Sequence, residues 1–256
     1  MSIILSLASR LFRLLSISSL WIAFVSAFGP TLIGEIYQIE VKPAIPLIVF
    51  LVTFAIYALD KVSGSVEDLL NTPDRAVLSG HPVKRAAALS YAVAIILVLA
   101  VDPPALPAVL IPGLAGILYT SRIHGVRPKD IPGCKNVVVA ASTAVCYAGL
   151  LHACLSAYML IFLLIWIDTV LFDCRDVVGD ASSGVRTIPV LLGPSRTLAL
   201  VGGFNLLLFA ISPLVAAVGC LLIVYFRKNR NVLAYDLLVD GWMMWSCIAI
   251  LLFKFS

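Results

Sequence analysis

Long apolar runs alternate with short polar segments along the whole chain. A helix needs about 20 apolar residues to span a bilayer, and fewer where the bilayer thins or protein covers its ends. The runs bounded by charges, Gly or Pro are 15–31, 44–59, 86–101, 106–119, 136–151, 155–172, 197–211, 213–226 and 237–253. The pattern predicts an all-α bundle of nine transmembrane helices. The seventh and eighth runs are short and nearly continuous, so a single span in their place, giving eight, is the alternative.

The distribution of basic residues favours nine spans. With nine spans and a cytoplasmic N-terminus, all Lys and Arg residues except Lys42 and Lys254 fall on the cytoplasmic side. Merging the seventh and eighth runs would move Arg227, Lys228 and Arg230 to the outside. Because cytoplasmic loops are enriched in Lys and Arg, the count of nine agrees better with this bias.

Composition leaves little room for a soluble domain. The 256 residues are 61% apolar and 12% charged, and no long polar stretch interrupts them. The chain therefore forms one membrane domain, 1–256, and its net charge of +4 serves topology rather than nucleic-acid binding. No obligatory protein partner is implied.

Three loops on the expected cytoplasmic side are longer than the outer connections. They span residues 60–85, 120–135 and 173–196, whereas an outer connection such as 102–105 is short. Irregular backbone at membrane depth is tolerated where it is buried or lines a cavity. We therefore expect a cytoplasmic cap over a central cavity, with the polar chemistry at or just beneath the cap.

Acidic residues cluster where the second and sixth spans end. If the helices continue, each cluster lies along one helix face: Asp60, Gly64 and Asp68 in the first, with Glu67 beside them, and Asp173, Asp176 and Asp180 in the second. Carboxylates beside basic residues suit Mg²⁺, which keeps several waters and links one or two carboxylates to phosphate oxygens. Solvated loop charges, balanced by Lys61, Arg75, Arg175 and Arg186, are the alternative.

Asp168 lies inside the sixth span, five residues before Asp173. An acid at that depth is costly, which makes it a functional candidate. It could orient or deprotonate a substrate, or it could pair with a hydroxyl or amide of a neighbouring helix.

The second cluster carries a resemblance to a known family. The segment DCRDVVGDASSGVRTIPVLLG resembles the second aspartate motif of the UbiA superfamily of intramembrane prenyltransferases. The first motif is matched less closely by YALDKVSGSVEDLLNTPDR. There Asp60 stands in place of an Asn, Gly64 in place of an Asp, and Asp68 matches.

Two further segments extend this resemblance over essentially the whole chain. The loop RIHGVRPKDIPGCKN resembles the family's stretch leading to a Lys-Asn pair, here Lys135 and Asn136. Asp236, Asp240 and Gly241 open the last run in a way that resembles the family's final helix, without an assigned role.

The resemblance implies Mg²⁺-dependent transfer of a polyprenyl group from its diphosphate to an aromatic or lipid-type acceptor, as in isoprenoid biosynthesis. The implied metal ligands are Asp60, Asp68, Asp173, Asp176 and Asp180. Asp168, Asp176 and Asp180 are the expected catalytic residues. Diphosphate contacts are expected from Arg75, Lys135 and Arg186. A prenyl and acceptor pocket is expected at Tyr57, Tyr119, Asn136 and Tyr147.

Two other functions compete with the transferase. Gly64 removes one expected metal ligand, and a terpene cyclase of the same superfamily would ionise a prenyl diphosphate with the same aspartates and need no acceptor. A cation-coupled transporter would place its acids near the bilayer midplane. Here only Asp168 lies that deep, and the other acids put the site on the cytoplasmic side.

Overall fold

The computed structural model describes residues 2–62, 81–120, 131–229 and 231–255, and its elements are helical throughout these ranges. The α-helices of the first half are α1 (Ser2–Ile17), α2 (Leu20–Ser26), α3 (Phe28–Tyr37), α4 (Ala44–Val62), α6 (His81–Val101), α7 (Leu106–Thr120) and α8 (Cys134–Leu150). Those of the second half are α9 (Leu155–Ser182), α10 (Ile188–Leu192), α11 (Pro194–Leu207), α12 (Pro213–Phe226), α13 (Val232–Leu238) and α14 (Trp242–Phe255). Two short 3₁₀ turns, η2 (Pro103–Ala105) and η4 (Leu208–Ala210), complete the set.

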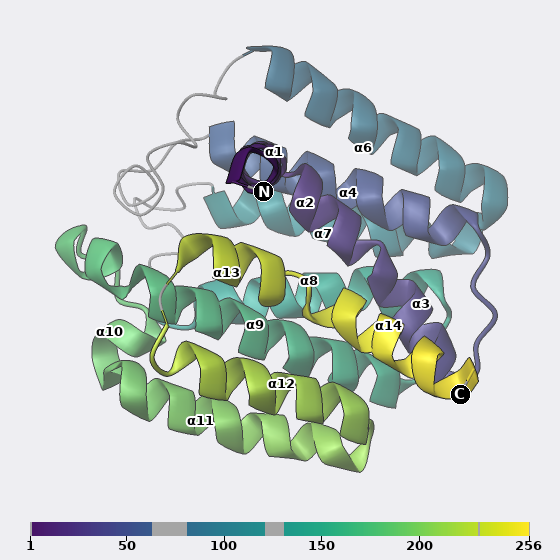
Figure 1. Ribbon diagram of the computed structural model, residues 1–256. Helices are drawn as coiled ribbons and strands as arrows, with labels where there is room; N and C mark the ends of the chain where they lie inside the picture. Colours follow the sequence, from purple (N-terminus) through teal and green to yellow (C-terminus); the bar gives the residue numbers. More distant parts are fainter. Residues whose placement is uncertain (1, 63–80, 121–130, 230, 256) are drawn as a thin grey trace.

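The long helix α9 runs through the middle of the bundle. It packs against α8 on one side and against α10 and α11 on the other. Figure 1 shows α4, α6 and α7 above it and α11 and α12 below it, with α13 and α14 crossing in front. The chain is therefore all-α, with α9 in contact with both halves of the bundle.

Each apolar run of the sequence lies within helical structure, and the protein is an integral membrane protein. Four segments are long and apolar enough to cross a bilayer: 20–37, 44–61, 82–101 and 155–182. The pair formed by α13 and α14 makes a fifth if it counts as one bent span. The shorter apolar helices α7, α8, α11 and α12 account for the other runs. Nine crossings and a cytoplasmic cap stay predictions.

The first apolar run is broken into three helices, where one was expected. Ser19 has a left-handed backbone, with φ 65°, between α1 and α2, and α3 begins only two residues after α2 ends. Pro30 lies in the first turn of α3, where its missing N–H costs no hydrogen bond. The ammonium group of Lys61 donates to the carbonyl oxygens of Ser16 and Ile17, at 2.9 and 3.0 Å, and so satisfies the C-terminal end of α1.

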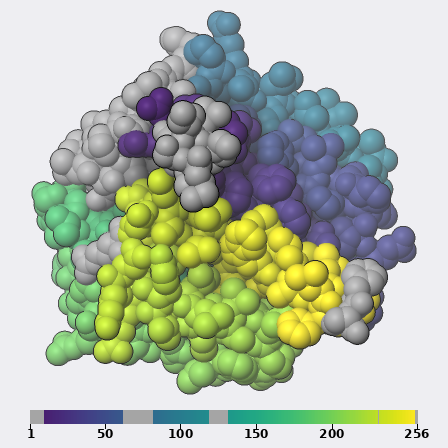
Figure 2. All heavy atoms as spheres, viewed as in Figure 1, coloured from purple at the N-terminus to yellow at the C-terminus, as the bar shows by residue number. Residues whose placement is uncertain are grey.

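The N-terminal and C-terminal helices meet on one face of the molecule. Figure 2 shows the purple N-terminal segment beside the yellow C-terminal helices. The indole N–H of Trp21 donates to the Asp236 carbonyl at 2.6 Å, and the Ser16 hydroxyl donates to the Asp236 carboxylate. These bonds attach the start of the chain to α13.

The seventh and eighth runs form two packed helices, α11 and α12, as the basic-residue distribution indicated. The chain turns between them at 208–212. Within this pair, the amide of Asn205 donates to the Ala216 carbonyl at 2.9 Å. The indole of Trp242, fully buried in α14, donates to the Val215 carbonyl at 3.2 Å. Polar bonds of this kind hold helices together where the surroundings are apolar.

Gly219 allows α11, α12 and α14 to approach closely. A Cβ atom at this position would overlap the Asn205 side chain and the Trp242 ring. Gly219→Ala should therefore lower the stability by about 1–3 kcal/mol, seen as a lower unfolding temperature in detergent. Gly202→Ala in α11 is the matched control, because nothing lies within 4 Å of its Cβ and alanine is the better helix former. Equal losses in the two variants would contradict the packing argument.

Lys42 lies between α3 and α4, and Lys254 lies in the last turn of α14. Both are at the same end of the bundle. Lys42 lies 3.9 Å from Asp102, which also accepts a 2.7 Å contact from His152. Lys254 forms a 2.9 Å ion pair with Glu35. The two lysines expected outside the cytoplasm thus share one end of the molecule.

Candidate active site

A cavity of about 830 Å³ opens between the two halves of the bundle, within the size range of small-molecule sites. Its walls come from α1, α2, α4, α6, α7, α8, α9, the α13–α14 junction and α14. Segments far apart in the sequence therefore contribute to one chamber.

One end of the cavity is charged. Asp60 and Lys61 lie in the last turn of α4, Lys135 lies in the first turn of α8, and Arg175 and Asp176 lie near the end of α9. Gly133, with φ 73°, provides the left-handed turn from which α8 begins, one residue before Cys134 and two before Lys135. The charged ends of three helices thus meet at the same end of the cavity.

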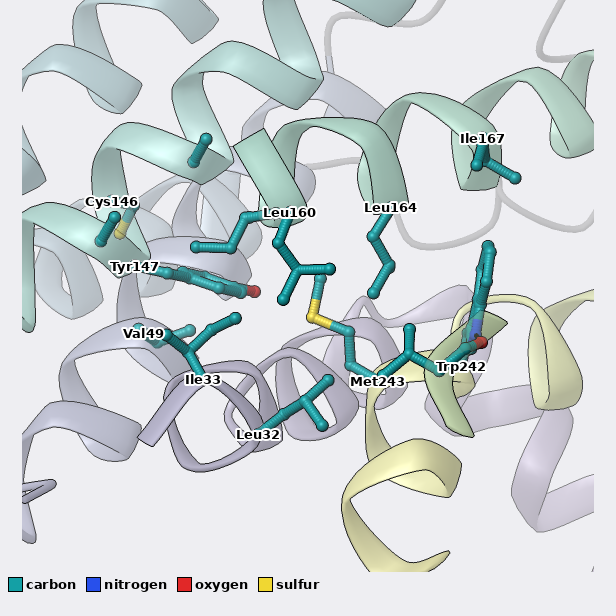
Figure 3. Close-up of a cluster of buried hydrophobic side chains, with 14 of the residues drawn as sticks. Leu32, Ile33, Val49, Cys146, Tyr147, Leu160, Leu164, Ile167, Trp242 and Met243 are labelled. Carbon is teal, nitrogen blue, oxygen red and sulfur yellow. Dashed lines mark hydrogen bonds between the residues drawn. The ribbon is translucent and has the colours of Figure 1, made fainter. Parts of the chain in front are cut away.

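The cavity becomes apolar farther along the same helices. Val52 precedes Asp60 by eight residues, Cys146 follows Lys135 by eleven, and Leu164 precedes Asp176 by twelve, all lining the cavity. At 1.5 Å per residue these separations correspond to about 12 to 18 Å along the helix axes. Figure 3 shows the inner end, where Tyr147, Leu164 and Met243 approach one another from α8, α9 and α14. The chamber therefore has a charged mouth and an apolar floor.

A single stripe of α9 faces the cavity. Its members recur every three or four residues, the repeat of one helix face: Leu164, Ile165, Asp168, Thr169, Phe172, Arg175 and Asp176. Asp168 and Arg175 are seven residues apart and so lie almost in line along the helix. Because this stripe faces the cavity, α9 can carry charged residues both within its apolar part, at Asp168, and near its end, at Arg175 and Asp176.

Arg175 organises the acids at the mouth. Its Nε and Nη2 donate to the two carboxylate oxygens of Asp176 at 2.6 and 2.8 Å, and its Nη1 donates to Asp236 at 2.9 Å. The guanidinium also lies over the Phe172 ring, 4.8 Å from its centre. The Arg175 side chain is only 5% exposed, so one buried cation holds two carboxylates from α9 and α13.

Asp173 faces α8, away from the cavity stripe. Its carboxylate accepts a 3.0 Å bond from the Lys135 ammonium and a 2.9 Å bond from the Asn136 amide, which also donates to Thr169 at 3.2 Å. Asp173 is fully buried, and it does not line the cavity. Asp173 therefore joins α8 to α9, and it differs from Asp176 in lying outside the cavity lining.

The expected site residues divide into three groups. Those that line the cavity are Asp60, Lys135, Asp168, Asp176, Tyr57 and Tyr147. Those in the described chain that do not line it are Asp173, Asp180 and Asn136, which are buried, and Arg186, which is exposed in the turn before α10. Asp68, Arg75 and the side chain of Tyr119 lie outside the described residues. The expected metal and diphosphate roles of the second and third groups stay predictions.

Three cavity residues carry charges to which sequence reasoning gave no role in binding. Lys61 and Arg175 were considered only as balancing charges, although each is adjacent to a site carboxylate, Asp60 and Asp176. Asp240 reaches the cavity at the junction of α13 and α14. An acid beside a glycine at the start of the last apolar run was its only signal in the sequence.

The mouth offers oxygen ligands of the kind that Mg²⁺ binds. Asp60 from α4 and Asp176 from α9 both line the cavity. Within the described ranges no three His, Cys, Asp or Glu side chains form a group close enough to hold a metal by themselves. Mg²⁺ typically takes one or two carboxylates and completes its shell with water and substrate phosphate, so this donor set fits a metal that arrives with a diphosphate.

Comparison with known proteins agrees with this arrangement. The family model described as the UbiA prenyltransferase family matches residues 15–253. The chain belongs to the UbiA prenyltransferase family.

The curated UbiA relatives include archaeal enzymes. The protein of Halobacterium salinarum named digeranylgeranylglyceryl phosphate synthase is 33% identical over 59% of this chain and 57% of its own length. The proteins of the same name from Natronomonas pharaonis and Methanoregula boonei are 30% identical over 57% and 69% of this chain, and over 55% and 63% of their own lengths. The chain thus spans less than two thirds of the length of these relatives.

Solved UbiA structures share the fold. A UbiA homolog from Archaeoglobus fulgidus bound to DMAPP and Mg²⁺ matches 92% of this chain and 98% of its own, with a TM-score of 0.64 and 15% identity. The same homolog bound to GPP and Mg²⁺ gives the same TM-score, with 16% identity over the same shares of the two chains. These likenesses extend across nearly the whole bundle.

Proposed function

We propose that this protein transfers a polyprenyl group from a polyprenyl diphosphate to an acceptor, with Mg²⁺ as cofactor. The observation that carries the proposal is the two-ended cavity, with acids and bases at the mouth and an apolar floor. A prenyl diphosphate has the same two-part chemistry, a charged head and a hydrocarbon tail. The family match and the prenyl diphosphates and Mg²⁺ bound by the Archaeoglobus homolog support this reading.

We propose a separate role for each wall of the cavity. Asp60 and Asp176 would hold the metal, and Lys61, Lys135 and Arg175, which also line the cavity, would offset the charge of the diphosphate. Bound Mg²⁺ supplies Lewis-acid stabilisation of the departing diphosphate. The apolar floor holds the chain and excludes water from the allylic carbon as the bond to the diphosphate breaks.

The first aspartate motif and the turn after α9 add residues to this set through the resemblance. Asp68 and Arg75 join the metal and diphosphate ligands from the segment that follows α4, and Arg186 joins them from the turn before α10. From the distribution of Lys and Arg we propose that the mouth lies on the cytoplasmic side. We propose a lipid acceptor of the glycerol phosphate type, which the name of the archaeal relatives favours.

The experiment is an assay of purified protein in detergent with geranylgeranyl diphosphate and Mg²⁺, with and without a monoalkylglycerol phosphate. We expect a prenylated lipid and diphosphate, formed only with both metal and acceptor, and we expect EDTA to stop the reaction. The control is restoration of the rate by excess Mg²⁺. A cyclic hydrocarbon formed without acceptor would replace the transferase by a terpene cyclase. Product formation that persists in EDTA would contradict the metal's role.

A further inference from the structure

Two further carboxylates line the cavity, and they come from different parts of the chain. Asp168 belongs to the cavity stripe of α9, and Asp240 belongs to the junction between α13 and α14. Asp168 is eight residues from Asp176, which places it about 12 Å deeper along the helix. Ionisable residues at such depth are costly and are found where they bind or react.

The break between α13 and α14 positions Asp240. The two helices meet at a bend of 47°, and the Trp245 indole donates to the Leu237 carbonyl across it at 3.1 Å. A Cβ atom at Gly241 would overlap this carbonyl and come within 2.6 Å of the indole nitrogen, so glycine permits the close turn. Non-helical backbone within a membrane is tolerated where it lines a cavity, as it does here.

Asp168, Asp240 and Tyr57 from α4 all line the chamber, and Asp240 interacts electrostatically with both Asp168 and Arg175. Three helical segments therefore direct polar groups to one region of the chamber. Within the described part of the chain, no basic side chain forms an ion pair with Asp168. Asp168 thus presents a carboxylate to the chamber without an ion-pair partner, and Asp240 adds a second carboxylate that also interacts with Arg175. Carboxylates placed in this way can bind a group that donates a proton.

Asp236 is a useful comparison, because its contacts are those of an acid with a structural role. Only four residues before Asp240, it accepts bonds from Arg175 and Ser16 through its carboxylate and from Trp21 through its carbonyl, and it does not line the cavity. Asp168 differs on both counts, since it faces the cavity and has no such set of protein donors among the described residues. The environment of Asp168 is therefore that of a residue that binds a ligand in the cavity.

We propose that Asp168 and Asp240 form the acceptor subsite, where they bind the acceptor's hydroxyl and take up its proton. The inference rests on the proposed prenyl transfer. In the step, the hydroxyl oxygen forms a bond to the first carbon of the prenyl chain, and the bond from that carbon to the diphosphate oxygen breaks. The electron pair leaves with the diphosphate, and the hydroxyl proton moves to a carboxylate of the pair. The acceptor class is thus a hydroxyl-bearing lipid or phenol whose hydroxyl reaches below the diphosphate.

The position of the pair suits this step. In the proposed reaction the metal and the diphosphate would lie next to Asp176, and the first prenyl carbon would lie beyond the diphosphate, toward the floor. Asp168, about 12 Å below Asp176 along α9, therefore lies on the far side of the reacting carbon from the metal. A proton acceptor there is separated from the metal-bound phosphates, so the two negative sites can act at opposite ends of the breaking and forming bonds.

The first test measures binding without catalysis. Wild-type protein should bind a monoalkylglycerol phosphate at least ten-fold more tightly than its hydroxyl-methylated ether, or an alkylphenol more tightly than its methyl ether. If only the glycerol phosphate ligands show the preference, the acceptor is a lipid; if only the phenol ligands show it, the acceptor is a phenol. Asp168→Leu and Asp240→Leu should remove the preference, whereas Asp102→Leu, at the Lys42 end of the bundle, should keep it. No preference in wild type, or a preference that survives in both leucine variants, would overturn the subsite.

The second test separates the subsite from the proposed function. With Mg²⁺, a non-reactive prenyl thiolodiphosphate should protect wild type, Asp168→Asn and Asp240→Asn equally against thermal unfolding. In the asparagine variants kcat for transfer should fall at least a hundred-fold with KM for the prenyl diphosphate unchanged, and Asp168→Glu should recover part of the rate. Wild-type transfer rates in both variants would reject the proton role. Failure of wild type to bind the thiolodiphosphate would instead reject the prenyl transfer itself.

Discussion

Arg175→Leu should destabilise the protein by about 3–5 kcal/mol, because it leaves the Asp176 and Asp236 carboxylates without their shared cation. Little water can replace the guanidinium at Asp236, since Arg175 and Asp236 are 5% and 7% exposed, whereas Asp176 borders the cavity. A loss of this size in a chain of this length corresponds to a fall of roughly 10 °C in unfolding temperature. Thermal unfolding in detergent, followed by intrinsic fluorescence, measures it.

Two controls identify the cause of this loss. Arg196→Leu removes an exposed arginine in the first turn of α11 and should change the unfolding temperature little. Arg175→Lys keeps the charge but not the two-pronged bond to Asp176, and it should fall between wild type and Arg175→Leu. Equal unfolding temperatures for Arg175→Leu and Arg196→Leu would show that the Arg175 network contributes no stability.

Asp176→Asn should lower the rate of prenyl transfer about a hundred-fold or more, equivalent to about 3 kcal/mol of transition-state stabilisation. Asp176 faces the cavity, and its carboxylate is one of the two oxygen ligands offered to the metal there. The loss should be accompanied by a higher Mg²⁺ requirement, because asparagine keeps one oxygen but not the negative charge. Initial rates over a Mg²⁺ titration give both quantities.

Asp173→Asn is the matched variant on the same helix. Its carboxylate contacts Lys135 and Asn136 and does not line the cavity. This change should lower stability by about 1–3 kcal/mol, because the bonds from α8 are weakened, and should leave the Mg²⁺ requirement of the folded protein within two-fold of wild type. An equal rise in Mg²⁺ requirement for the two variants would show that Asp173 is also a metal ligand.

The sequence predicted the helices and the acids of the site better than the direction in which each acid points. Apolar runs and their flanking charges identify helices directly, and the basic residues separated α11 from α12 correctly. The spacing of Asp173, Asp176 and Asp180 placed them on one face, but 100° per residue leaves Asp176 about 60° around the helix from Asp173. That difference decides which carboxylate meets α8 and which meets the cavity.

The remaining features depend on contacts between distant segments. Nothing near Ser19 in the sequence shows that Lys61 will bond to the end of α1, and nothing near Asp240 shows that Asp168 will lie close to it. Both depend on how complete helices pack. The role of Arg175 could not be predicted for the same reason. In the sequence it is a cation that balances neighbouring acids, and only the folded structure shows its bond to Asp236 of α13.

The length of α9 bears on how a substrate reaches the chamber. Its 28 residues extend about 42 Å, whereas the hydrocarbon core of a bilayer is about 30 Å thick. The charged end of the cavity stripe can therefore lie at headgroup level while Leu164 and the floor lie among the acyl chains. A prenyl diphosphate would then enter in the orientation of an ordinary phospholipid and move sideways within one leaflet. Its charged head would never cross the hydrocarbon, and a lipid product could diffuse back into the same leaflet.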